Sequence, residues 1–189
     1  MTDIDWTREL VDQLDRHYAN QARPRLDGLT DPEYFWEPVP GWNVRPRDAS
    51  TPPEAPGSGP FTIDFGYPEP VPPPVTTIAW RLGHILVGVL GMRTASHFGG
   101  PAMDYQSYDY PGTASEALNR LDGAYALWIQ NVNMLDDDGL RAPCGPAEGP
   151  FADAPMATLI LHINREMIHH LAETALLRDL YAHRDSLRR

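Results

Sequence analysis

The stretch LILHINREMIHHLAETALLRDLY, residues 159–181, decides the fold of this chain. It contains no glycine or proline and is rich in leucine and alanine, which predicts one continuous helix. At about 100° per residue its apolar side chains fall on one arc, which we expect to face the protein core. These side chains are Leu159, Ile163, Leu177 and Leu180.

The expected buried arc also carries ionisable side chains. His162, Glu166 and His170 follow one another at steps of four residues, with His169 and Glu173 close beside them. Burying an unpaired carboxylate is costly, on the order of several kcal/mol. We therefore expect Glu166 to meet a cation, to be protonated or to reach a water-filled cavity.

A divalent metal ion would satisfy Glu166 and His170 together. Residues four apart lie one turn apart on the same helix face, close enough to hold one ion. Two ligands do not complete a site, so this hypothesis requires a third ligand elsewhere in the chain. A glutamate and a histidine at this spacing also form ordinary ion pairs, and the spacing alone leaves both interpretations open.

Composition and charge limit the classes of protein to which this chain can belong. The chain has 189 residues, of which 42% are hydrophobic and 22% charged, and this predicts one folded domain over residues 1–189. Its net charge of −11, without any lysine or arginine cluster, argues against nucleic acid or an anionic membrane as partner. The N-terminus lacks a secretion signal and no long apolar run is present, so we expect a cytoplasmic protein.

The single cysteine, Cys144, limits the chemistry that thiols can supply. It rules out disulfides within the chain and zinc sites built from several thiolates. A catalytic thiol is not the favoured interpretation of Cys144, because reactive cysteines usually lie near cations or helix N-termini. Acid and base chemistry is therefore expected from histidine, carboxylate, tyrosine and arginine side chains.

The pattern of amphipathic stretches predicts an all-α protein. Four such stretches have helical spacing, and four long helices favour a four-helix bundle. They cover residues 3–27, 76–97, 113–135 and 159–181. Apolar residues on their outer faces could form a homodimer interface, but patterning does not distinguish this from contacts with a loop.

The segment 28–74 between the first two predicted helices is dense in proline, which excludes a long helix or a central strand. It also carries many aromatic residues, Trp42 among them, so it is expected to pack over other parts of the protein. Two interpretations stay open. The segment is either a lid over a pocket or a cover for the helix ends.

The second predicted helix, 76–97, supplies the candidate for the third metal ligand. Trp80, Arg81 and His84 lie on one stripe of this helix with Gly88 and Gly91, whose small size invites close approach of a neighbouring helix. A lone histidine on such a packed face is more often a satisfied core residue than a ligand. His84 is nevertheless the obvious partner for the two candidate ligands of the last helix.

Two motifs link these helices to a known family. The run from Ile78 to His84, IAWRLGH, and the run from Glu166 to His170, EMIHH, resemble motifs of the DinB/YfiT-like superfamily of bacterial four-helix metalloenzymes. This superfamily includes bacillithiol S-transferases and the N-terminal domain of mycothiol-dependent maleylpyruvate isomerase. The resemblance covers the helical frame and not the segment 28–74. It implies an up-down-down-up bundle.

The resemblance also implies a site and a chemistry. The family's ligands correspond here to His84, Glu166 and His170, with zinc the expected ion and nickel or iron also suited. The implied activity is that of a thiol-dependent S-transferase or isomerase, with a low-molecular-weight thiol of the mycothiol type acting on a small electrophile. Metal-dependent hydrolysis and a non-enzymatic metal-binding or stress-response role are the alternatives. The side chains expected around the ligands are Trp42, Trp80, Arg81, His162 and His169.

Overall fold

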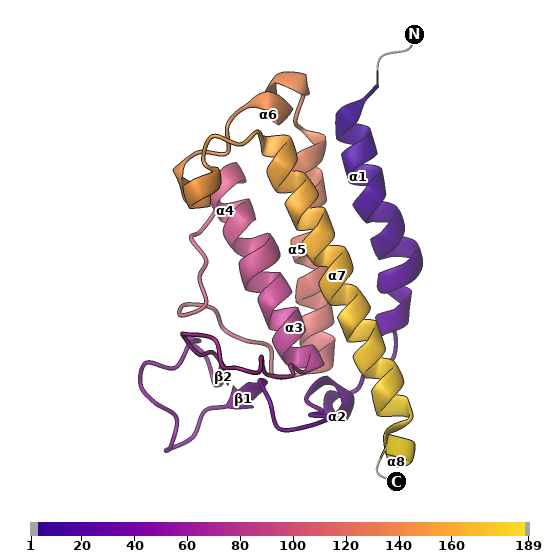
Figure 1. Ribbon diagram of the computed structural model, residues 1–189, viewed down its shortest axis with the longest axis vertical. Helices are drawn as coiled ribbons and strands as arrows, with labels where there is room; N and C mark the ends of the chain where they lie inside the picture. The colour runs from indigo at the N-terminus through magenta and orange to yellow at the C-terminus, as the bar shows by residue number, and fades with distance from the viewer. Residues whose placement is uncertain (1–3, 188–189) are drawn as a thin grey trace.

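The computed structural model describes residues 4–187 and is mostly helical, as the sequence predicts (Figure 1). Its first helix, α1, runs from Trp6 to His17. The Asp5 side chain caps it by accepting a hydrogen bond from the backbone N–H of Arg8 at 3.0 Å. A π-helical turn, η1 (Tyr18–Ala22), and a 3-10 turn, η2 (Pro24–Leu26), complete the first predicted stretch.

The second long helical segment is continuous but not uniform. It consists of α3 (Ile78–His84), a π-helical stretch η3 (Ile85–Gly91) and α4 (Met92–Phe98). The side chain of Thr77 caps its start by accepting from the backbone N–H of Trp80 at 3.1 Å. We refer to residues 78–98 as the central rod.

The remaining helices follow in the predicted order. The third long helix, α5, covers Ala114–Asn133, and the fourth, α7, covers Met156–Ala182. Between them lie α6 (Asp137–Arg141) and the 3-10 segment η4 (Pro146–Phe151), and α8 (Arg184–Leu187) follows α7. Among residues 4–187, no helix combines the length and apolar character needed to cross a bilayer.

The four long segments lie side by side around one core (Figure 1). Helix α1 packs on α5 and α7, and the central rod also packs on both of these helices. Side chains from all four segments are fully buried, including Leu14, Ile85, Trp128 and Ile163. Burial of these apolar faces is the main force that holds the segments together.

The segment 28–74 is more ordered than a free loop. It contains a short helix α2 (Asp31–Tyr34) and two strands, β1 (Val44–Pro46) and β2 (Phe61–Ile63), which pair antiparallel with Val44 opposite Ile63. These elements lie near the start of α3 in Figure 1. Tyr34, Val44 and Ile63 are buried in the core, so the segment is anchored to the helices by its own apolar side chains.

Candidate metal centre

Helices α3 and α7 bring the three predicted metal ligands next to one another. The rings of His84 and His170 lie 4.8 Å apart between centroids and are nearly perpendicular, at 89°. Nε2 of His170 lies 3.5 Å from Oε2 of Glu166. His170 therefore lies close to both of the other predicted ligands.

The ionisable side chains of α7 are less buried than their arc predicts. Leu159, Ile163 and His170 are buried, at 4%, 1% and 7% exposure, but the Glu166 and His162 side chains keep 26% and 41% of their surface. Leu180, expected on the same arc, is only half-buried. Glu166 thus lies at the edge of the buried face, where water reaches its carboxylate, which is one of the three outcomes that the sequence left open.

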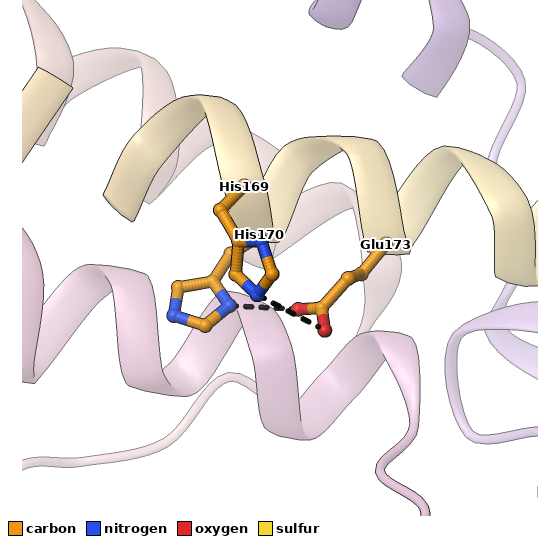
Figure 2. Close-up of side chains that lie close together, drawn as sticks. All are labelled: His169, His170 and Glu173. Atoms are coloured by element: carbon orange, nitrogen blue, oxygen red, sulfur yellow. Dashed lines mark hydrogen bonds and ion pairs between the residues drawn. The ribbon is translucent and has the colours of Figure 1, made fainter. Parts of the chain in front are cut away.

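A second group of candidate ligands overlaps the first. Ligand atoms of His169, His170 and Glu173 lie within 4.8 Å of one another (Figure 2). The Glu173 carboxylate lies 2.8 Å from Nδ1 of His170 and 3.4 Å from Nε2 of His169. The sequence identified Glu173 only as a neighbour. Its position three residues after His170 was the available signal, since such residues share a helix face.

The surroundings of His170 distinguish the two groups. On the Nδ1 side, the Arg81 guanidinium lies 3.3 Å from His170 and 3.1 Å from Glu173, and this permanent positive charge opposes a cation there. His169 is also largely exposed, at 62%. On the other side, Nε2 faces Glu166. A guanidinium also lies near Glu166, but the Arg165 side chain is 70% exposed and that of Arg81 only 21%, so water screens the positive charge better on the Nε2 side. We infer that an ion is opposed less there, while the Nδ1–H of His170 donates to Glu173, which fixes the ring orientation.

His84 is held in a similar way from the opposite helix. Its Nδ1 lies 2.6 Å from the hydroxyl of Tyr105, and its ring stacks on Trp80 at 5.5 Å. Burial raises the pKa of Tyr105 to about 12, so the phenol keeps its proton near neutral pH. Sequence reasoning missed Tyr105, because it lies in the irregular connection after the central rod and no periodic pattern points to it.

Both imidazoles are neutral near pH 7. Burial, reinforced by repulsion from His170 and Arg81, lowers the pKa of His84 to about 4. Burial also lowers the pKa of His170, although its contact with Glu173 opposes this change. A neutral imidazole is the form that binds a metal, so the protein does not have to remove protons to hold one.

Aromatic side chains from the segment 28–74 lie against this site. Trp42 packs on Trp80 at 5.7 Å and on Phe65 at 6.1 Å, and Phe65 packs on Tyr105 at 6.5 Å. The indole N–H of Trp80 donates to the Asp64 carbonyl at 2.8 Å. The segment therefore forms a wall beside His84.

His162, predicted as a supporting residue, contacts the candidate ligand on the side away from Glu173. Its Nδ1 lies 3.6 Å from the Glu166 carboxylate. Arg165, which the sequence did not single out, lies 3.4 Å from the same carboxylate and 2.6 Å from His162. These two side chains connect the site with the N-terminal half of α7.

Comparison with known proteins identifies the family of this chain. The sequence model of one protein family, described as the DinB superfamily, matches residues 13–174. The match includes the central rod, α5 and the part of α7 that carries Glu166 and His170. Searches of the curated proteins and of the solved structures give no significant match.

Proposed function

We propose that this chain, which belongs to the DinB superfamily, is a metal-dependent enzyme in which His84, Glu166 and His170 hold one divalent cation. Its proposed activity is transfer of a low-molecular-weight thiol of the mycothiol type to a small electrophile, or a thiol-dependent isomerisation. The observation that carries the metal proposal is the position of His170, with Nε2 3.5 Å from Glu166 and its ring 4.8 Å from that of His84.

The donor set fits a catalytic ion. Two neutral imidazoles and one carboxylate leave coordination positions for a substrate, and zinc is the expected ion, with nickel or iron also suited. Glu173 contacts Nδ1 of His170, and the Tyr105 hydroxyl contacts Nδ1 of His84. Such contacts hold the rings of metal-binding histidines in place. We also infer that the four long segments form the up-down-down-up bundle of the superfamily.

A bound ion would supply the positive charge that lowers the pKa of a thiol or a water beside it. The chain itself orients the ligands through Glu173 and Tyr105 and restricts water through the wall around Trp80. In the proposed transfer the thiol loses its proton to solvent, its sulfur forms a bond to the electrophilic carbon, and the leaving group departs with the bonding electrons. The segment 28–74 would act as the lid.

Metal analysis of natively purified protein tests the first half of this proposal. We expect one ion per chain in the unaltered protein and in His183→Ala, which removes an exposed histidine at the end of α7. His84→Ala should lose the ion. If the unaltered protein carries no stoichiometric ion and His84→Ala leaves thermal stability unchanged, the site is not a metal centre and both enzymatic functions fail.

A thiol assay tests the second half. Mycothiol or bacillithiol is supplied with the electrophile monochlorobimane, and turnover is followed by fluorescence. Thiol-dependent turnover that disappears in His84→Ala supports the transferase. Hydrolysis of ester or amide substrates without any thiol would instead favour the metal-dependent hydrolase. A bound ion without either activity would favour the non-enzymatic metal-binding or stress-response alternative. In that case the protein would bind a small molecule without turnover, or its outer helix faces would form a homodimer interface.

A further inference from the structure

A cavity of about 730 Å³ lies next to the candidate metal centre, between α4, η4 and α7. Its volume is in the range of pockets that bind small organic molecules. Two of its lining residues, His162 and Arg165, are the ones that contact the Glu166 carboxylate. The cavity therefore adjoins the outer side of the proposed ligand set.

The walls of the cavity are apolar with a few charged groups. Phe151, Leu161 and Ala154 supply apolar surface, and the first two are well exposed, at 68% and 57%. Large exposed apolar side chains around a concave site are typical of surfaces that bind a ligand. Cys144 also lines the cavity, and burial raises the pKa of its thiol, so it adds no negative charge at neutral pH.

The charges on the wall favour an anion. Three lining residues carry full charges, namely Arg93, Arg165 and Glu148. Glu148 is already satisfied, because its carboxylate lies 3.2 Å from Arg93 and 2.9 Å from His97, and only 9% of its side chain is exposed. This leaves Arg165, 70% exposed, as the cation that can meet a ligand.

We propose that this cavity binds a small organic acid that has an apolar portion. Arg165 would pair with the carboxylate group of this ligand, and the Phe151 side chain would contact its apolar portion. A guanidinium matches a carboxylate with two parallel hydrogen bonds, which makes the pairing selective. The ligand would be the electrophile of the reaction, and this assignment rests on the proposed function. The binding itself does not require turnover.

Glu166 couples the cavity to the metal centre. Without a cation its carboxylate competes for Arg165 at 3.4 Å. A cation that engages Glu166 releases Arg165 for the ligand, so carboxylate binding and metal binding should strengthen each other by the same factor. Glu166→Gln removes the competing charge without any metal, and it should therefore tighten carboxylate binding in metal-free protein.

Calorimetric titration with 4-phenylbutyrate and its neutral amide tests the proposal. We expect the carboxylate to bind at least about tenfold more tightly than the amide, which corresponds to about 1.4 kcal/mol. Arg165→Gln should abolish this preference, and Arg165→Lys should keep part of it. Phe151→Ser should weaken both probes alike. Arg16→Gln, on the exposed face of α1 with 76% of its side chain exposed, is the matched control and should change neither.

The outcomes separate this inference from the proposed function. Equal affinity for the two probes, or a preference that survives Arg165→Gln, would overturn the cavity assignment even if the protein carries zinc and turns over thiol. Charge-selective binding that is tighter in Glu166→Gln supports the assignment even if the protein holds no metal.

Discussion

At the scale of single residues, the proposed metal centre depends on the surroundings of the two nitrogens of His170. Nε2 faces Glu166 at 3.5 Å, whereas Nδ1 faces Glu173 at 2.8 Å beside the Arg81 guanidinium. A carboxylate can accept a hydrogen bond from the histidine nitrogen that does not bind the metal, and it then raises metal affinity without being a ligand itself. The two carboxylates therefore have separable roles.

We predict a graded effect of substitutions on zinc affinity, measured by competition with a chelator. Glu166→Gln should abolish stoichiometric binding, because it removes a ligand. Glu173→Gln should weaken binding by about 10- to 100-fold, because it removes only the support of His170. His169→Ala should have little effect, since this ring is largely exposed. The reverse order, with His169 essential and Glu166 dispensable, would assign the ion to the Nδ1 side.

The lowered pKa of His84 predicts how the metal-free protein responds to acid. Its ordinary pKa is 6.5 and its folded value is about 4, so the unfolded chain binds the proton more readily in between. Stability should therefore be intact above about pH 6.5 and should fall as pH drops toward 4, by at most about 3 kcal/mol from this residue. Burial of His170 acts in the same direction.

Urea unfolding in the presence of a chelator, at pH values from 7.5 to 4.5, measures this dependence. His84→Gln cannot take up the proton and should show a shallower loss of stability over this range. His183→Ala, which removes an exposed histidine, should follow the unaltered protein. If the His84→Gln profile has the original slope, His84 is not the group that titrates.

The sequence foresaw part of the site. The IAWRLGH and EMIHH motifs pointed to His84, Glu166 and His170, and the fold places His170 close to each of the other two. Whether these residues hold an ion stays a prediction. The motifs did not identify Tyr105, which reaches His84 from an irregular connection, or the contact of Arg81 with Glu173. Such contacts depend on how separate elements pack, and periodicity within one element carries no information about this.

At the scale of elements, the π-helical stretch η3 shapes the site. The glycines on this stretch were expected to admit a neighbouring helix, but at Gly88 the structure has the Tyr105 side chain instead. A Cβ atom at Gly88 would collide with the Tyr105 hydroxyl and lie 3.2 Å from the His84 ring. The missing side chain thus provides the space in which Tyr105 reaches Nδ1 of His84.

Gly88→Ala should therefore displace Tyr105 and disturb His84. We expect a loss of about 1–3 kcal/mol in stability, as for other cases of overpacking, together with weaker zinc binding. Gly123→Ala in α5 is the matched control, because no atom outside its own helix lies within 4 Å of the added methyl group. That change should be neutral or stabilising by up to about 1 kcal/mol, since alanine is the better helix former. Thermal unfolding of the two variants would show whether space at Gly88 matters.

The helix ends were more predictable than the interiors. Aspartate and threonine are typical N-cap residues, and the structure has Asp5 at the start of α1 and Thr113 at the start of α5, where the Thr113 side chain accepts from the Glu116 N–H. The π-helical turns carried no such signal, because they depend on packing against neighbouring segments. The strands of the segment 28–74 are three residues each, too short to show alternation.

At the scale of the whole molecule, the ion pair between Arg178 and Glu33 joins the segment 28–74 to the last long helix. Arg178 of α7 donates to Glu33 at 2.7 Å and to the backbone carbonyls of Arg25 and Asp27. The Glu33 side chain is only 6% exposed, and that of Arg178 is 20% exposed. These contacts join the end of the first helical segment, α2 and the last long helix at one point.

Removing one partner should cost more than removing both. Arg178→Ala leaves the Glu33 carboxylate buried without its cation, and we expect a loss of about 3 kcal/mol, measured by urea unfolding. The double variant Glu33→Gln with Arg178→Ala should recover part of this loss, because no uncompensated charge remains. Arg16→Ala, which removes an exposed arginine of α1, should change stability by less than about 1 kcal/mol. If Arg178→Ala costs no more than this control, the ion pair contributes little, and the segment is held by its apolar side chains and by its hydrogen bonds to α3 and α5.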